Sequence, residues 1–272
     1  MTTNSSPIVN NKSLSIRIAT DGLSFCVYSP AESQPYTYRK WKMNHLVSLA
    51  ANLKAALTTE PMLQQLYKRV NVLVASPQYT TLPLVEFNRE SISDIFSFVF
   101  PTSEPQHVSY NLLRHSGVAI IFGLDKVVHQ LIIDDFPHAR FYAAASTLIE
   151  HLGEKSLLGI GKHLFAYLHD KEMSLYAFDQ GRMLLSNSYS VGNTDDCQYY
   201  LLQVWQQLGF EQLSDNLSII TDEQETCPLT ERMRYFIKNV SEEENSKDAQ
   251  ISTSDAFAQI PYDLQTLLVC GF

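Results

Sequence analysis

Residues 14–29, LSIRIATDGLSFCVYS, decide the fold of the first part of the chain. Apolar and polar residues alternate over 14–18 and again over 23–28, and Thr20-Asp21-Gly22 between them has the composition of a tight turn. This pattern predicts a β-hairpin with one face buried. The β-rich run 36–41 follows a Pro-containing loop and predicts a third strand.

The period of the pattern changes after this third strand. Helical spacing is carried by Leu46, Leu49, Leu53 and Leu57. Asn44 precedes these leucines and is suited to cap the first turn of a helix. The apolar run 70–75 then predicts a buried strand. The first part of the chain therefore has the order β-β-β-α-β.

The same order returns about 150 residues later, a period that indicates two related domains rather than a solenoid. Residues 163–191, HLFAYLHDKEMSLYAFDQGRMLLSNSYSV, alternate between turn segments. We predict strands at 162–168, 173–178 and 183–189, a helix from Thr194 to Leu208, and a strand at 217–221. The alternative is that two α/β domains share a common motif by chance.

The remaining segments connect and follow the two copies. Between the copies we predict helices at 92–100, 126–132 and 141–152, strands at 108–114 and 118–123, and a boundary at 153–161. After the second copy we predict a helix at 229–240, an exposed charged loop at 241–254, and a short helix at 260–272 packed on the second domain. A membrane-touching tail is the alternative for this last helix, which lacks the Lys and Arg face that such tails use.

Composition excludes several classes of protein. The chain has 272 residues, a formal net charge of −9 and 45% hydrophobic residues. The hydrophobic share excludes a disordered chain, and the acidic balance argues against a general nucleic-acid binder, which needs a basic surface. Residues 1–13 are polar, do not resemble a signal peptide and are predicted to be disordered. No apolar run approaches the ~20 residues of a spanning helix. We expect a cytoplasmic protein without an integral membrane segment.

Metal-binding and disulfide patterns are weak in this sequence. The four cysteines are Cys26, Cys197, Cys227 and Cys270, and their scattered spacing predicts reduced thiols. His163 and His169 lie on one face of a predicted strand, but two imidazoles without a third ligand are weak evidence for a metal site. Asp134-Asp135 is interpreted as a helix end, and Asp195-Asp196 as the first turn of a helix. No metal ligand and no catalytic residue is assigned.

A three-stranded meander, a crossover helix and a further strand, repeated in one chain, is the plan of the actin-like ATPase superfamily. On residues 14–29, 138–152 and 163–191 the chain resembles an uncharacterised bacterial domain-of-unknown-function family with this fold. Type IV pilus assembly and cell-division actin homologues are more distantly similar. The resemblance implies an α/β protein with two ribonuclease-H-like domains, at residues 14–155 and 156–272, each with a mixed β-sheet flanked by helices.

In that superfamily, two hairpins carry Asp-x-Gly motifs that hold the phosphates of a nucleotide. Here Asp21 and Gly22 are adjacent, without the intervening residue, and the second hairpin, at Asp170-Lys171, has no glycine. A purely structural Asp-Gly turn is the favoured interpretation of the first hairpin. The sequence 222–225, Asp-Glu-Gln-Glu, stands where adenosine-binding glycines are expected. The weak candidates for nucleotide binding are Asp21, Gly22, Ser24, Asp170 and Lys171.

These departures lead to three hypotheses about function. The first is a non-catalytic actin-like protein, a pseudo-ATPase without a cofactor, that acts through an unknown protein partner as an adaptor or assembly component. The second is an ATP- or GTP-binding protein with slow or no hydrolysis, in which Asp21, Ser24 and Asp170 hold Mg-ATP. The third is a metal-dependent nuclease, for which the first strand offers Arg17 instead of a carboxylate. Two segments are rich in aromatic residues, Tyr199-Tyr200 and residues 36–41. They either contact a partner or belong to elements whose two faces both pack against helices.

Overall fold

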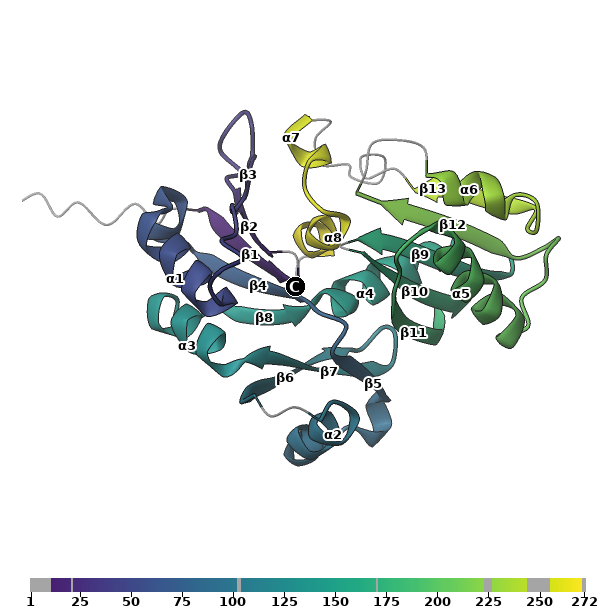
Figure 1. Ribbon diagram of the computed structural model, residues 1–272, viewed down its shortest axis with the longest axis horizontal. Coiled ribbons are helices and arrows are strands. Elements are labelled where there is room, and N and C mark those ends of the chain that lie inside the picture. Colours follow the sequence, from purple (N-terminus) through teal and green to yellow (C-terminus); the bar gives the residue numbers. More distant parts are fainter. Residues whose placement is uncertain are drawn as a thin grey trace, which may run out of the picture.

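The computed structural model describes residues 11–20, 22–101, 104–169, 171–222, 227–243 and 255–270. Two halves, each built around a five-stranded sheet, lie side by side, and helices α4 (Ala144–Ser156) and α8 (Tyr262–Cys270) lie between them (Figure 1). A third, smaller sheet extends from the first half. The described residues contain no helix long and apolar enough to cross a membrane.

The first sheet has the strand order β3-β2-β1-β4-β8. Its strands are β1 (Ser13–Ala19), β2 (Gly22–Tyr28), β3 (Tyr36–Lys40), β4 (Arg69–Ala75) and β8 (Arg140–Ala143). β1, β2 and β3 form an antiparallel meander, whereas β4 runs parallel to both β1 and β8. Crossover connections of this kind need a helix, and α1 (Leu49–Thr59), followed by a 3-10 turn (Pro61–Gln64), supplies it between β3 and β4.

The second sheet repeats this plan with the order β11-β10-β9-β12-β13. Its strands are β9 (Lys162–His169), β10 (Glu172–Asp179), β11 (Arg182–Ser190), β12 (Asn216–Thr221) and β13 (Asn239–Glu243). Helix α5 (Thr194–Gln207) is the crossover between β11 and β12. The predicted order β-β-β-α-β is therefore present twice. The boundary predicted between residues 155 and 156 remains a prediction.

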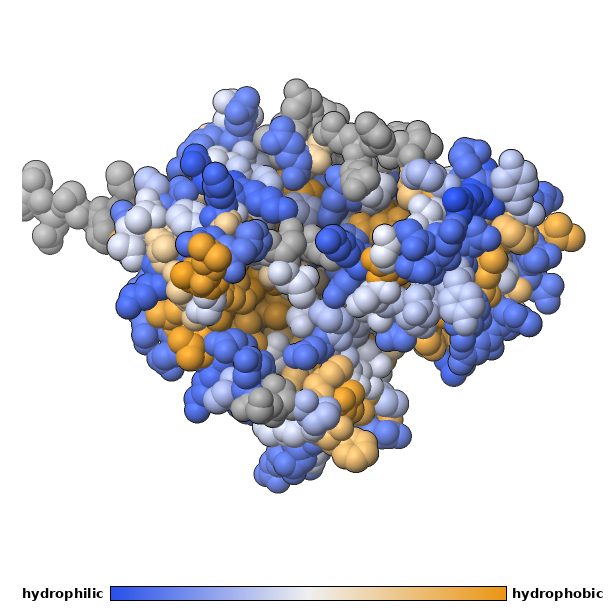
Figure 2. Space-filling view, in the orientation of Figure 1, coloured by the Kyte–Doolittle hydropathy of each residue, from blue (hydrophilic) through white to orange (hydrophobic). Residues whose placement is uncertain are grey.

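The third sheet has the order β5-β7-β6 and belongs to the segment between the two copies. Its strands are β5 (Tyr79–Pro83), β6 (Gln106–Leu113) and β7 (Val118–Asp125), and the accompanying helices are α2 (Ile92–Val99), α3 (Lys126–Asp135) and two 3-10 turns (Leu84–Glu86 and Arg89–Ser91). Gly123 lets α2 approach β7, because a Cβ there would lie 2.4 Å from the ring of Phe96. Phe98 on α2 is 89% exposed, and hydrophobic surface is visible around this helix (Figure 2).

The first strand is buried on both faces, which corrects the prediction of one buried face. Ile16 and Ile18 enter the main core with Phe25 from β2. On the opposite face, Ser15 and Arg17 are also buried, and the C-terminal residues cover this side of the sheet. α8 packs on α4 and β4, so the C-terminal helix contacts the first sheet instead of packing only on the second domain as predicted.

Three predicted helices have different limits in the structure. α1 begins at Leu49 with Ser48 as its N-cap, and Leu46 is 94% exposed, so Asn44 does not cap the helix. Residues 141–143, predicted as helix, belong to strand β8. The helix predicted at 229–240 is shorter in the structure, where α6 spans Pro228–Met233. Residues 239–243, predicted partly as helix and partly as loop, form strand β13. Helix α7 (Asp255–Ala258) precedes α8.

Candidate functional site: the cleft between the two halves

A cleft of about 660 Å³ lies between the two hairpins and is lined by both halves. From the first half it takes side chains of β1, β2 and β3. From the second half it takes the β9–β10 hairpin, the start of α5 and the start of α6. Residues 259 and 261, between α7 and α8, complete the lining. This volume is within the range of small-ligand sites.

Three side chains of the first sheet form a row on the cleft face. Strand register pairs Arg17 with Ser24, and Ser24 with Lys40. Directly paired residues of neighbouring strands project from the same face of a sheet. All three line the cleft. The hairpin alternation therefore brings a hydroxyl between two cations.

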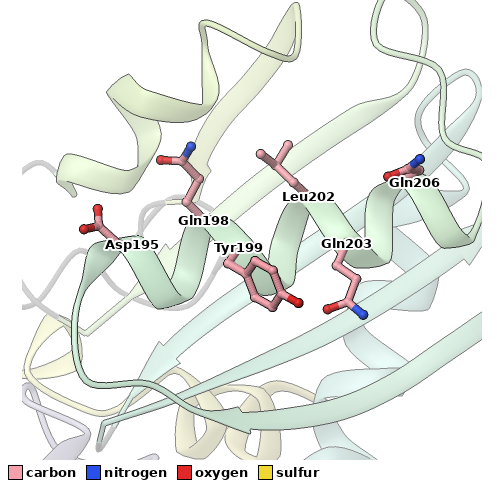
Figure 3. A pocket seen from close by; sticks show the side chains of 6 residues that line it. All are labelled: Asp195, Gln198, Tyr199, Leu202, Gln203 and Gln206. Atoms are coloured by element: carbon pink, nitrogen blue, oxygen red, sulfur yellow. The ribbon is translucent and has the colours of Figure 1, made fainter.

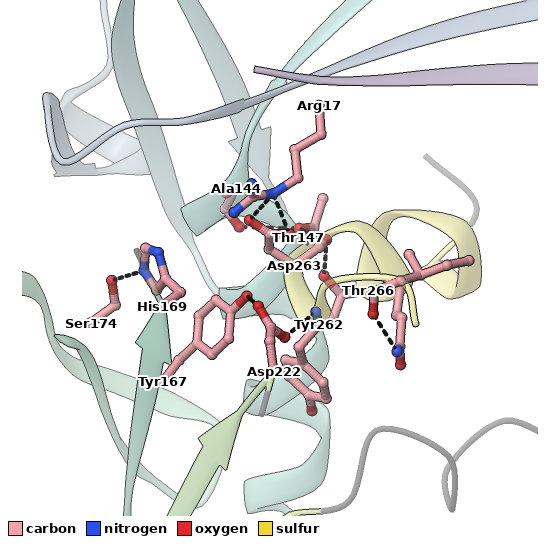
Figure 4. Close-up of polar contacts among 12 residues, drawn as sticks. Arg17, Ala144, Thr147, Tyr167, His169, Ser174, Asp222, Tyr262, Asp263 and Thr266 are labelled. Atoms are coloured by element: carbon pink, nitrogen blue, oxygen red, sulfur yellow. Dashed lines mark hydrogen bonds and ion pairs between the residues drawn. The ribbon is translucent and has the colours of Figure 1, made fainter. Parts of the chain in front are cut away.

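Arg17 is paired with a carboxylate of the C-terminal helix. Its Nε lies 2.9 Å from both carboxylate oxygens of Asp263, and the two side chains are only 6% and 1% exposed (Figure 4). A buried guanidinium without such a partner would be strongly destabilising. Asp263 thus neutralises the cation that β1 directs toward the cleft.

The equivalent position in the second half is Tyr167. The last pair of residues before the turn is Ala19 with Gly22 in the first hairpin and His169 with Glu172 in the second. Arg17 and Tyr167 each lie two residues before this pair, so they occupy corresponding positions. The Tyr167 hydroxyl donates to Oδ2 of Asp222 at 2.7 Å (Figure 4). Tyr167 is fully buried and does not line the cleft, whereas Asp222 does, so this hydrogen bond lies behind the residues of the cleft wall.

Asp222 follows β12 and joins the second half to α8. Its Oδ1 accepts from the backbone N–H of Tyr262 at 2.8 Å. Although part of Asp222 is exposed, its carboxylate reaches inward, and burial raises the pKa of this group to about 6, with the nearby Asp263 charge adding to the effect. The first two residues of α8 therefore contact Asp222 of one half and Arg17 of the other.

The start of α5 forms another wall of the cleft, and its backbone donors are used within the chain. Asn193 Oδ1 accepts from the N–H groups of Asp195 and Asp196 at 2.8 and 3.0 Å. The Asp196 carboxylate accepts from the N–H of Gly192 at 2.8 Å. Helix N-termini bind anions through free N–H groups and the positive end of the helix dipole. At α5 the chain's own side chains take that position, as the first-turn interpretation of Asp195-Asp196 implies.

The structure brings Gly22, Ser24 and Lys171 together in the lining of this one cleft, as the two-hairpin resemblance implies. Asp21 and Asp170, the other two predicted nucleotide contacts, lie outside the described residues. Ser24 is 3% exposed, and its hydroxyl makes no hydrogen bond of normal geometry among the described residues, although Tyr38 of β3 is near enough to interact with it. Lys171 has a left-handed backbone with φ of 62°, which completes the second hairpin without a glycine.

Sequence reasoning did not find the residues that bond to Arg17 and Asp222 from behind the cleft wall. Tyr167 and Asp263 have no motif, and Arg17 was noted only for the carboxylate that it replaces. The signal that could have found Arg17 is a cation in the middle of an otherwise apolar, doubly buried strand, since such a charge needs a buried partner.

The other sequence hypotheses have simpler structural explanations. Asp134 and Asp135 end α3, as predicted. His163 and His169 bond to Ser218 and Ser174, respectively. Within the part of the chain that the structure describes, no cluster of three or more His, Cys, Asp or Glu side chains could hold a metal ion. The four cysteines are free thiols. Tyr36 is buried, whereas Tyr199 is 63% exposed.

Comparisons with known proteins agree with this architecture. The family described as protein of unknown function (DUF3822) matches residues 2–240. A Bacteroides thetaiotaomicron protein with an actin-like ATPase fold and unknown function is 34% identical, with 96% of this chain and 97% of that chain covered and a TM-score of 0.83. A chain of the PilM-PilN type IV pilus biogenesis complex is 10% identical, with 94% and 96% covered and a TM-score of 0.55. No curated protein matches.

Proposed function

The chain belongs to the DUF3822 family of proteins of unknown function, and we propose that it is a non-hydrolysing actin-like protein that acts through protein–protein contacts, as an adaptor or assembly component. The observation that carries this proposal is that the chain's own carboxylates take the anion-binding positions of the cleft. Asp263 accepts a hydrogen bond from the Arg17 guanidinium, and Asp196 accepts one from the N–H of Gly192, which precedes α5.

The described residues do not fit a magnesium nucleotide. Phosphate binding at a hairpin needs backbone that a ligand can approach closely, which is the reason for glycine at such positions. At Gly22 a Cβ would lie 2.8 Å from Cγ of Met43, so this glycine makes room for a side chain of the chain itself. The Asp196 carboxylate bonds to the N–H of Gly192 at the wall of the cleft, and its negative charge would repel a polyphosphate there.

The proposal that the chain acts through a protein partner is supported by analogy with another protein of the same fold. In the PilM-PilN complex, a protein of this fold is part of a type IV pilus biogenesis assembly. At 10% identity that likeness supports only the idea that the fold can serve as an assembly component. The identity of the partner is therefore left to experiment.

We expect purified protein to release no phosphate from Mg-ATP above the rate of an Asp21→Ala variant. Asp21 is the hairpin carboxylate that a hydrolytic mechanism would require, and its adjacency to Gly22 puts it out of the family's register. The measurement is a steady-state phosphate-release assay on both proteins, with thermal unfolding to establish that both are folded. Faster release by the wild type would reject the proposal.

One observation favours a second candidate function, nucleotide binding without hydrolysis. The Ser24 hydroxyl is buried, lines the cleft and makes no hydrogen bond of normal geometry among the described residues, where Tyr38 is its neighbour. A buried hydroxyl without a hydrogen bond is unfavourable, so a ligand that bonded to it would gain affinity. This candidate requires binding that is weakened by Ser24→Ala.

A further inference from the structure

The hollows outside the cleft differ in whether their polar groups already have partners. One lies along an exposed face of α5, from Asp195 to Gln206 (Figure 3). Among the described residues, its one charged side chain, Asp195, is paired with Arg232, and no buried polar atom that lacks a hydrogen bond lines it. This face gives no indication of a ligand.

A pocket of about 320 Å³ lies at the opposite end of the first sheet from the cleft. β1 begins at Ser13 in this pocket and passes Arg17 in the cleft, and the two sites share no lining residue in the described part of the chain. The start of β4 and the second half of α8 form other walls. Its volume is at the lower end of the range of small-ligand sites.

Three cationic side chains line this pocket because two parallel strands begin beside each other there. The N–H of Lys68 donates to the carbonyl of Lys12 at 3.0 Å, just before β4 and β1 begin. Arg69 is the first residue of β4. All three line the pocket, whereas none of its described lining residues is Asp or Glu. A concave surface of one sign of charge attracts ions of the opposite sign, so this pocket favours an anion.

Lys68 has both the charge and the donors to bind such an anion. Its Nζ donates to Oδ1 of Asn11, a neutral amide oxygen, at 3.1 Å. An ammonium group has three N–H donors, and this contact uses one of them. Lys12 is paired with Glu32 at 2.7 Å, so Lys68 is the cation on which an anion site depends most.

Asn71 is a buried polar side chain of this pocket whose oxygen has no partner. It lies on β4 opposite Ser15 of β1, on the sheet face that α8 covers. Asn71 is 7% exposed, and its Oδ1 makes no hydrogen bond among the described residues. A buried polar group without a hydrogen bond is unfavourable, and a ligand that bonded to this amide would relieve that cost.

The Asn71 amide sets a second requirement for the ligand. Rotation about χ2 exchanges its oxygen and its NH2 group, and both orientations are accessible to an Asn side chain. One orientation presents an acceptor to the pocket, and the other presents donors. A ligand with a hydroxyl beside its anionic group matches either orientation, whereas an ammonium donor would be repelled by the Lys68 charge.

Charge and size together define the class of ligand. A phosphate group carries a charge between about −1.5 and −2 at neutral pH, and Lys and Arg are its usual partners. The pocket has about half the volume of the cleft, which suits a sugar-sized molecule, and Leu267 and Leu268 of α8 offer apolar surface to its carbon frame. We propose that this pocket binds a small hydroxylated phosphate, of the size of a triose or hexose phosphate. Lys68 contacts the phosphate, and Asn71 contacts a hydroxyl beside it.

The test is an isothermal titration of the full chain with glycerol 3-phosphate and with glucose 6-phosphate. For at least one of these esters we expect a saturable heat, with one molecule per chain and a Kd of about 1 mM or lower. Inorganic phosphate lacks the carbon frame and glucose lacks the charge, so we expect each to bind at least about tenfold more weakly. Ser24→Ala alters the cleft alone and should leave this binding unchanged, so the result is independent of the proposed function.

Two variants locate the binding in this pocket. Lys68→Gln removes the charge and keeps an amide that can bond to Asn11, and we expect about tenfold weaker binding. Lys54→Gln is its control, because it removes an equal charge from the exposed side of α1, which packs on the opposite face of the sheet. Asn71→Leu keeps the shape of the side chain and removes the amide. We expect it to lose the binding and to unfold at no lower urea concentration than the wild type.

The proposal would be overturned by a Kd above about 1 mM for both esters. Equal affinity for inorganic phosphate would also overturn it, since the hydroxyl would then have no role. Binding that either Lys68→Gln or Asn71→Leu leaves unchanged would place the ligand outside this pocket.

Discussion

Replacing Asp263 with alanine is expected to lower the free energy of unfolding by about 3–5 kcal/mol, because it removes the buried carboxylate that neutralises the Arg17 guanidinium. The guanidinium is 6% exposed and bonded to both oxygens of the carboxylate. The measurement is urea unfolding at neutral pH, followed by circular dichroism. The loss is expected to be greater than for an exposed ion pair such as Lys12–Glu32, which contributes little because water screens the charges.

A double variant distinguishes an unpaired charge from lost packing. Arg17→Met with Asp263→Leu removes both charges and keeps apolar bulk at the two positions. Such replacements of buried pairs are often neutral, so we expect most of the stability to return. If Asp263→Ala lost less than about 1 kcal/mol, in the range of an exposed pair, the ion pair would not be what holds α8 between the halves.

The second large effect is a loss of stability in acid through His163. Burial lowers the pKa of this imidazole to about 4, below its usual 6.5, and the Lys155 charge acts in the same direction while Glu243 opposes it. The unfolded chain therefore binds a proton more readily than the folded one. The stability that the folded chain gains by keeping His163 neutral is complete above pH about 6.5. It is lost as the pH falls toward 4, and the free energy of unfolding decreases by about 3 kcal/mol in total.

His163→Gln is the matched variant for this acid effect. A glutamine can bond to Ser218, the partner of the His163 Nε2 at 2.8 Å, but it does not titrate. Urea unfolding of both proteins from pH 7.5 to pH 4 gives the difference in free energy. We expect the wild type to lose stability relative to the variant over this range. A constant difference would show that His163 titrates alike in both states.

The order of strands and helices along the chain was predictable because it depends on local patterns. The alternation at 14–28 and 163–191 marks the hairpins, and turn residues set their lengths. Helix limits were less predictable where tertiary contacts decide them. Residues 239–243 carry a helical stripe at Val240, yet they pair in parallel with β12, because the sheet offers an edge that a single-sequence pattern does not reveal.

The buried contacts behind the cleft wall could not be predicted from the sequence. Arg17 and Asp263 are separated by 246 positions, and nothing local to either residue identifies its partner. The same is true of Tyr167 and Asp222, which meet because β9 and β12 are neighbours. The meeting of Gly22, Ser24 and Lys171 in one cleft could be expected, since the family resemblance implies two hairpins that face the same cleft.

The most direct test is an isothermal titration of the wild-type chain with Mg-ATP and with Mg-GTP to millimolar concentration. If the chain's own carboxylates take the anion-binding positions of the cleft, the heat will equal that of dilution for both nucleotides. A saturable heat with one nucleotide per chain that is lost in Ser24→Ala would contradict this account. It would show instead that the cleft holds a nucleotide.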